Sequence, residues 1–237
     1  MGPDIFVACL RGLSSGSRTM SSGTSPDVIR RLGAALVGLV SLGALVLQYV
    51  LILQNTRDTI GPVLGTVRFI SYFTILSNLG VVLVTLTFAL HRGGIFSRAD
   101  ARGVVALCIG VTGIVYTAIL RHLWSPQGAQ WWADSGLHYA VPLLYVLWWV
   151  FLSPHAGLAW TSTLRWLVFP AVYTVWVFVR GAWVHEYPYP FLDVDQLGWS
   201  RVLVNSVGVL VLFVVVGLLL VAIDRLLAKR LARPLAA

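Results

Sequence analysis

RFISYFTILSNLGVVLVTLTFAL, residues 68–90, is long and apolar enough to cross a bilayer, which takes about 20 apolar residues in a helix. Its first eleven residues nevertheless carry five polar side chains: Arg68, Ser71, Thr74, Ser77 and Asn78. Polar groups are costly in lipid, and membrane helices usually turn them toward the interior of a bundle. The stretch therefore predicts a bundle of membrane helices that encloses a polar region near residues 68–78.

The whole chain has the composition of a membrane protein. Of its 237 residues, 58% are hydrophobic and 11% are charged, and the mean hydropathy is +0.83. Soluble domains carry about 25% charged residues. The net charge of +8 does not indicate nucleic-acid binding, because the basic residues lie at the ends of apolar runs, where they determine topology. Only Lys229 among the 17 basic residues is a lysine, which we interpret as a sign of a GC-rich bacterial genome.

Six apolar segments of suitable length are predicted at 30–53, 68–90, 102–122, 136–153, 164–184 and 199–226. A stretch rich in Ser, Gly and Thr precedes them and is typical of disorder. We therefore expect an all-α fold: a disordered tail over 1–29, a six-helix transmembrane domain over 30–228 and a basic cytoplasmic tail over 229–237.

The distribution of basic residues predicts that both termini are cytoplasmic. In this orientation twelve of the 17 basic residues lie inside: Arg11, Arg18, Arg30, Arg31, Arg92, Arg98, Arg102, Arg165, Arg225, Lys229, Arg230 and Arg233. The other five lie outside: Arg57, Arg68, Arg121, Arg180 and Arg201. This orientation follows because cytoplasmic loops are enriched in Lys and Arg. We expect a multi-pass protein that is located in the bacterial plasma membrane.

The polar residues of the predicted helices gather in the outer third of the bundle. Thr74, Asn78, His138 and Asn205 fall at similar depths there, whereas the inner halves of 136–153 and 199–226 are almost wholly apolar. We expect these four residues to line the polar end of a pocket with an apolar floor formed by Leu, Val and Trp. Such a pocket suits a lipid amphiphile, and the sequence does not indicate the oligomeric state.

The residue types in this region allow ester hydrolysis. Thr74 is a candidate nucleophile, His138 a candidate general base, and Asn78 or Arg68 a candidate donor to the oxyanion. Simpler interpretations stay open: Thr74 bonds back to its own helix, Asn78 joins two helices, and His138 is an interfacial histidine. Asp134 either orients the His138 ring or forms the N-cap of the helix over 136–153.

A second polar group is predicted at the outer surface. Arg121, His122, Arg180, His185 and Tyr189 could bind the head group of a lipid at the pocket mouth, or form an ordinary interfacial ion-pair network. The loop EYPYPFLDVDQLGW, residues 186–199, is rich in proline and aromatic residues and is expected to cover the mouth.

Three stretches carry a resemblance: RFISYFTILSN (68–78), HYAVPLLYVLWWVF (138–151) and YPYPFLDV (187–194). Over residues 30–228 the chain resembles a bacterial family of six-helix membrane proteins of uncharacterised function. That family is distantly similar to the eukaryotic androgen-induced membrane proteins, which are threonine-type hydrolases of fatty acid esters of hydroxy fatty acids. The resemblance implies that Thr74, in its Tyr-Phe-Thr context, and His138, ahead of Pro142, form the catalytic pair, with a fatty-acyl ester as substrate and no cofactor.

Three alternatives remain from the sequence. A metal-dependent lipid hydrolase could use His122, Asp134, His138 and His185, although their spacing matches no common zinc motif. A bis-histidine haem protein would need a partner for His138 at matched depth. The third alternative is a non-enzymatic lipid-binding or scaffold protein.

Overall fold

The computed structural model describes residues 26–232, and within this range all regular secondary structure is helical, which confirms the all-α prediction. The α-helices are α2 (Pro26–Thr56), α3 (Gly61–Ile70), α4 (Phe73–Ala89), α5 (Ala99–Ala118), α6 (Gly128–Ser135), α7 (Val141–Phe151), α8 (Ser162–Trp166), α9 (Val168–Val184) and α10 (Val194–Ala232). The short elements are η1 (Ile95–Ser97), η2 (Leu120–His122), η3 (Gly136–Ala140) and η4 (Pro190–Leu192).

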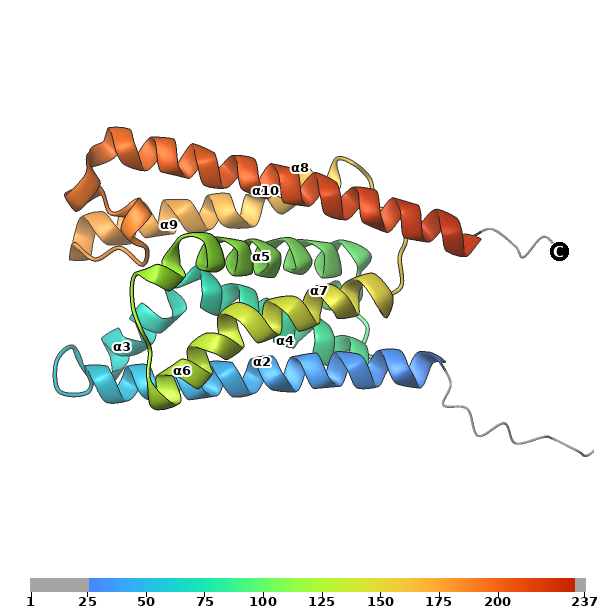
Figure 1. Cartoon of the computed structure of the whole chain (residues 1–237), viewed down its shortest axis with the longest axis horizontal. Helices are drawn as coiled ribbons and strands as arrows, with labels where there is room; N and C mark the ends of the chain where they lie inside the picture. The colour runs from blue at the N-terminus through green and yellow to red at the C-terminus, as the bar shows by residue number, and fades with distance from the viewer. Residues whose placement is uncertain (1–25, 233–237) are drawn as a thin grey trace, which may run out of the picture.

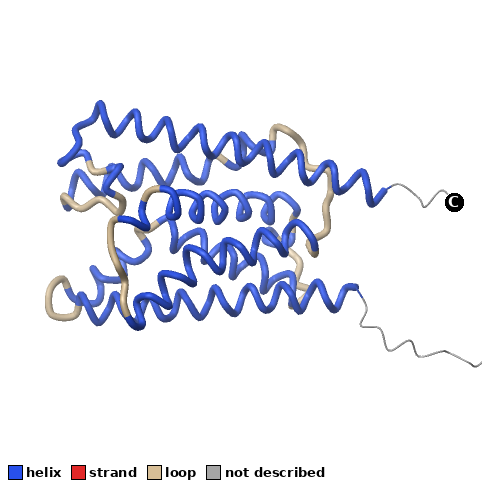
Figure 2. The backbone as a smooth tube through the Cα atoms, viewed as in Figure 1, coloured by secondary structure: helices blue, strands red, loops and turns tan. Residues whose placement is uncertain are grey.

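The long helices lie roughly side by side along one axis (Figure 1). Helix α2 forms one side of the bundle and α9 with α10 the opposite side, while α4, α5 and α7 lie between them (Figure 1). The beginning of α2 and the end of α10 lie at the same end, and the loops gather at the two ends (Figures 1 and 2). We call the end away from these two points the distal end.

Four helices are long and apolar enough to cross a membrane: Pro26–Thr56, Ala99–His122, Ser162–Val184 and Val194–Arg230. A fifth span exists if α3 and α4, which are bent by 74° relative to each other, are counted together. The chain is therefore a helical membrane protein. The helical stretch 128–151 is not among these candidates, because its first half carries Gln130, Asp134 and His138.

The single helix predicted over 68–90 is wrong, because the chain bends between α3 and α4. Tyr72 is extended there, with φ −88° and ψ 130°. The hydroxyl of Tyr173, on α9, accepts a hydrogen bond from Phe73 N (3.1 Å) and donates one to Ser71 O (2.9 Å). Since backbone groups freed at a helix end need partners, this tyrosine stabilises the bend. As a result α4 begins at the level of its polar residues.

A π turn, η3, interrupts the helix between α6 and α7. Val141 N donates to Gly136 O, five residues earlier, in place of the usual four. Pro142 follows directly, and a proline disrupts a helix because it lacks an N–H and crowds the carbonyl four residues before it, which is that of His138. The distortion next to Pro142 thus takes the form of a π turn, a feature that is frequent at functional sites.

The predicted domain limits differ slightly from the structure. Helix α2 begins at Pro26, so the last four residues of the predicted tail are helical, and residues 1–25 lie outside the described range. Helix α10 continues to Ala232, into the predicted basic tail, and residues 233–237 lie outside the described range. Trp148 and Trp149, expected in a pocket floor, are buried in the core instead.

Candidate active site

Thr74 and His138, which are 64 residues apart in the sequence, meet inside the distal half of the bundle. Thr74 lies in the first turn of α4, and its Oγ1 is 3.3 Å from Nε2 of His138, on the π turn. Thr74 is 6% exposed. The Thr74 hydroxyl is thus directed at an imidazole. It does not form the hydrogen bond to a carbonyl of its own helix, which was the simpler interpretation of this residue.

The surroundings of His138 determine which ring nitrogen carries the proton. Nδ1 lies 3.0 Å from the Asp134 carbonyl oxygen and 3.1 Å from its Oδ1, and both of these oxygens are acceptors. Nδ1 must therefore be the protonated nitrogen of the neutral ring, which leaves Nε2 as an acceptor facing the Thr74 hydroxyl. This is the tautomer that a general base requires.

Asp134 and the His138 ring are both held by Tyr116, from the last turn of α5. The Tyr116 hydroxyl donates a hydrogen bond to Asp134 Oδ2. Its ring stacks on the imidazole with centroids 3.8 Å apart and planes 13° apart. Asp134 lies near the end of α6, whose N-cap residue is Gln127, so the N-cap interpretation of Asp134 is wrong. Asp134 instead contacts the histidine ring, through a hydrogen bond to its carbonyl oxygen and through its nearby carboxylate.

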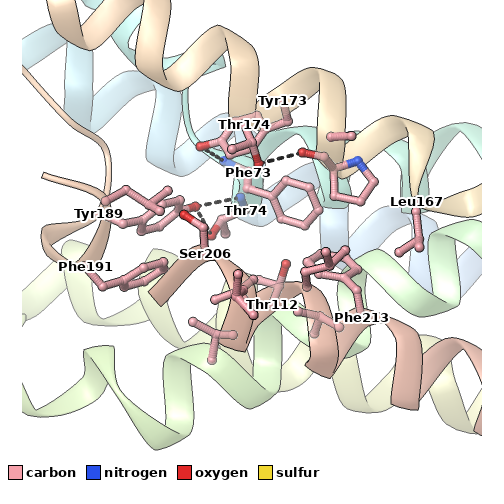
Figure 3. Close-up of a pocket in the computed structure, with 18 of the residues that line it drawn as sticks. Phe73, Thr74, Thr112, Leu167, Tyr173, Thr174, Tyr189, Phe191, Ser206 and Phe213 are labelled. Carbon is pink, nitrogen blue, oxygen red and sulfur yellow. Dashed lines mark hydrogen bonds between the residues drawn. The ribbon is translucent and has the colours of Figure 1, made fainter. Parts of the chain in front are cut away.

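Tyr189 contacts Thr74 from the other side. Its hydroxyl accepts a hydrogen bond from Thr74 N (3.2 Å) and lies 3.4 Å from Thr74 Oγ1 (Figure 3). Burial raises the pKa of the Tyr189 hydroxyl, although hydrogen bonds with Thr74 act in the opposite direction. The hydroxyl therefore stays protonated at neutral pH and can donate a hydrogen bond.

Tyr189 belongs to a segment that we call the strap, residues 185–193, at the distal end. Glu186 pairs with Arg68 on α3 and with Arg180 on α9, the latter at 2.9 Å. The ring of Tyr187 packs against Gly181, where a β-carbon would collide with it. These contacts fix the part of the strap that precedes Tyr189.

The other residues predicted for the pocket do not line it. The side-chain amide of Asn78 donates to Thr74 O (2.8 Å) and Leu137 O (3.3 Å), and the residue is 0% exposed. Asn205 donates to Phe191 O at 2.9 Å and thereby holds the strap. Asn78 therefore joins α4 to the π turn, which is the simpler of its two interpretations, and neither asparagine faces the Thr74 hydroxyl.

The predicted head-group residues are divided among three separate sets of contacts. Arg180 and Tyr189 contribute to the strap and its contacts, as described. Arg121 and His122 are exposed and bond to each other, Nε to Nε2, at 3.0 Å. His185 is also exposed and pairs with Asp195 at 2.9 Å. The structure thus forms no single cluster of all five, and Arg68 lies in the strap ion pairs and not at the Thr74 hydroxyl.

Two cavities meet at Thr74, His138 and Tyr189. The first, which we call the α9–α10 cavity, has a volume of about 390 Å³ and is lined by α4, α5, α9, α10 and the strap (Figure 3). The second, the distal cavity, has a volume of about 350 Å³ and is lined by α2, α3, α4, α5, α6 and the strap. Both volumes fall in the range of small-molecule sites, about 300–1,000 Å³.

The four candidate metal ligands are not brought together. His185 and His122 lie in separate exposed contacts, away from the Asp134–His138 pair. Across residues 26–232, no group of three or more His, Cys, Asp or Glu side chains has a geometry that could hold a metal ion. The metal-dependent alternative therefore has no ligand set in this part of the chain.

Sequence reasoning missed Tyr116 and Tyr173. Each is a tyrosine within an apolar helix, and such a hydroxyl needs a partner when it is buried. This requirement indicates from the sequence that each hydroxyl has a hydrogen-bond partner, but it does not identify that partner. Here the partners are Asp134 and the backbone at the start of α4.

Fold and site together define a class: a helical membrane protein in which a threonine hydroxyl meets an imidazole where two cavities join, with a carboxylate close to the other ring nitrogen. No known family model, curated protein or solved structure matches the chain.

Proposed function

We propose that the protein is a threonine-type hydrolase of lipid esters, with Thr74 as nucleophile and His138 as general base. One observation carries the proposal: Thr74 Oγ1 lies 3.3 Å from the acceptor nitrogen of His138, while the other ring nitrogen donates to the Asp134 carbonyl oxygen at 3.0 Å and lies 3.1 Å from the Asp134 carboxylate. An alcohol hydroxyl is too weak an acid to attack an ester unaided, so an oriented imidazole is the partner it needs. The resemblance to threonine-type fatty-ester hydrolases points to the same two residues.

The first half-reaction forms an acyl-enzyme. Thr74 Oγ1 attacks the ester carbonyl carbon, and His138 Nε2 takes the hydroxyl proton. The imidazolium that results is stabilised by Asp134, as in other triads of this type. The tetrahedral intermediate then collapses, the alcohol leaves with the proton from His138, and the acyl group stays on Thr74 as an ester.

Water completes the reaction in the second half. His138 Nε2 removes a proton from a water molecule, which attacks the acyl-Thr74 carbonyl. Collapse of this intermediate returns the proton to Thr74 Oγ1 and releases a fatty acid. Each step uses the same nitrogen alternately as base and as acid, so no further proton carrier is needed.

Tyr189 is the donor best placed for the oxyanion. Its hydroxyl oxygen accepts a hydrogen bond from Thr74 N at the start of α4, which leaves its own proton available beside Thr74 Oγ1. The positive end of the α4 dipole lies at the same position and favours negative charge there. This assignment replaces Asn78 and Arg68, whose donors are engaged with Thr74 O and Leu137 O, and with Glu186.

Covalent labelling tests the proposal. A fluorophosphonate probe should react with purified protein, and peptide mass spectrometry should place the adduct on Thr74. Labelling should disappear in Thr74→Ala and persist in Thr85→Ala, which removes a buried threonine hydroxyl that bonds only within the same helix. An adduct at another residue, or none, would count against the threonine mechanism.

The proposed arrangement in the membrane is six crossings with both termini in the bacterial cytoplasm. The supporting observations are the basic residues, twelve inside against five outside, and the position of the start of α2 and the end of α10 at one end of the bundle (Figure 1). In this orientation the distal end faces outward.

Cysteine accessibility checks the orientation. In a Cys9→Ser, Cys108→Ala background, Gln196→Cys should react with an impermeant maleimide in intact cells, whereas Gly93→Cys should react only after lysis. Both positions are exposed, so the difference reports the side of the membrane. The reverse pattern would invert the orientation.

A further inference from the structure

The α9–α10 cavity extends from the catalytic residues along the bundle. Figure 3 shows Tyr189 and Phe191 at one end and Leu167 and Phe213 at the other. Phe213 follows Ser206 by seven residues on α10, a rise of about 10 Å at 1.5 Å per residue. The cavity is therefore elongated, and Thr74 lies nearer to its Tyr189 end (Figure 3).

The hydroxyl groups in the cavity wall are already engaged. Thr112, Thr174 and Ser206 each donate to a carbonyl of their own helix, at 2.9, 2.8 and 2.8 Å. The Tyr173 hydroxyl is used in the bend before α4. Since these donors are turned into the backbone, the wall offers mainly methyl, aliphatic and aromatic surface to an occupant. Only the end at Thr74, His138 and Tyr189 offers reactive polar groups.

The cavity is open on the side where α9 and α10 face outward. Leu203, Val207 and Leu210 on α10 line it, yet they are 54%, 59% and 49% exposed. Ala171 on α9 also lines it and is exposed. Both helices are candidate membrane spans, so this opening faces the hydrocarbon region of the bilayer. An alkyl chain can pass through it without entering water.

The distal cavity differs in its polar groups. Gln48 and Gln130 meet there, with Gln130 Nε2 donating to Gln48 Oε1 at 2.8 Å, and each amide keeps further hydrogen-bonding capacity. Trp124 and Pro190, both exposed, also line this cavity. This side can therefore admit a polar group and water.

We propose that the α9–α10 cavity binds the acyl chain of the ester, which enters sideways from the membrane between α9 and α10, while the distal cavity receives the alcohol. This inference rests on the proposed hydrolysis at Thr74. Its chemical logic is that the alcohol leaves first, and the space it vacates must then admit the water that attacks acyl-Thr74. If the chain filled the distal cavity instead, the acyl-enzyme would block its own access to water.

A matched pair of substitutions on α9 tests the assignment. Ala171→Trp places a large ring in the cavity toward its Leu167 end, whereas Val172→Trp adds the same ring to the neighbouring residue, which is 64% exposed and lines neither cavity. Purified proteins are compared on 4-nitrophenyl butyrate and palmitate in detergent micelles. We expect Ala171→Trp to lower the palmitate-to-butyrate ratio of kcat/KM at least tenfold and Val172→Trp to leave it unchanged. An unchanged ratio in Ala171→Trp would overturn the assignment while leaving the hydrolase proposal in place.

A binding measurement separates this inference from the hydrolysis. Cis-parinaric acid, a fatty acid that fluoresces in apolar surroundings, is titrated into Thr74→Ala, with and without Ala171→Trp or Val172→Trp. We expect Ala171→Trp to weaken binding at least tenfold and Val172→Trp to have no effect. If wild-type protein hydrolyses no ester but this binding pattern holds, the cavity binds acyl chains and the hydrolase proposal fails. If Ala171→Trp binds as well as Val172→Trp, the acyl site is wrong whatever the activity.

Discussion

Alanine at Thr74 or at His138 should each lower ester hydrolysis on the order of 10⁴-fold or more, because the first change removes the nucleophile and the second removes its base. The double variant should be hardly slower than either single variant, since the two side chains act in one step and their effects are not additive. Thr74→Ser should keep part of the rate, because it retains the hydroxyl and loses the methyl group that restricts its rotamers. The measurement is kcat/KM on 4-nitrophenyl esters.

Thr85→Ala is the matched control for this series. Thr85 lies on the same helix as Thr74, is buried, and bonds through Oγ1 to Val81 O at 2.7 Å, outside both cavities. It should therefore keep its activity. Thermal unfolding of each variant shows whether lost activity reflects lost fold. Full hydrolysis by well-folded Thr74→Ala would rule out the threonine mechanism, and multiplicative losses in the double variant would show that the two residues act separately.

The helical segments were predictable because the signals for them are local. Apolar runs near 20 residues predicted the regions that form α2, α5, α9 and α10, and these four are candidate membrane spans. Thr74 and His138 were noticed for a related reason, since a threonine followed by Ser and Asn, and a histidine in an apolar run, are unusual in lipid. Their meeting at 3.3 Å agrees with the depths inferred from the sequence.

The bend before α4 was not predictable from residues 68–90 alone. The hydrogen bonds that stabilise it come from Tyr173 and Tyr189, which are 100 and 115 residues away from their partners. A tyrosine within an apolar sequence indicates that its hydroxyl has a hydrogen-bond partner, but it does not indicate where in the chain that partner lies. The sequence left open whether Asn78 serves the oxyanion or joins two helices for a similar reason, because the Leu137 carbonyl it binds lies in the π turn next to Pro142.

Two tyrosine hydroxyls, of Tyr173 on α9 and of Tyr189 on the strap, contact the backbone at the start of α4. In a soluble hydrolase, backbone amides at a turn often form the oxyanion hole. Here the amides of Phe73 and Thr74, at the start of α4, both donate to tyrosine hydroxyls. The Tyr173 hydroxyl donates a hydrogen bond to Ser71 O, whereas the Tyr189 hydroxyl lies 3.4 Å from Oγ1 of Thr74, the proposed nucleophile. Only Tyr189 can therefore transmit the positive character of the helix end to the substrate.

Tyr189→Phe should lower kcat by about 10²–10³-fold with little change in KM, the loss typical of removing one oxyanion donor. KM should hold because the ring, with its stacking on Phe191 at a centroid distance of 5.4 Å, is retained and only the hydroxyl is lost. The measurement is steady-state hydrolysis of a long-chain 4-nitrophenyl ester at neutral pH. Thr74 N then loses its acceptor, so unfolding must be followed in parallel.

Tyr72→Phe provides the comparison for Tyr189→Phe. Tyr72 lines the distal cavity and its ring meets that of Tyr189 edge-on at 6.1 Å, so the change removes a hydroxyl from the same surroundings. The backbone of Thr74 makes its hydrogen bond to Tyr189 and not to Tyr72, and the rate should therefore stay within about twofold of wild type. If Tyr189→Phe and Tyr72→Phe fall together, the effect comes from the general polarity of the cavity. If Tyr189→Phe raises KM and leaves kcat unchanged, the hydroxyl binds substrate uniformly and does not stabilise the transition state.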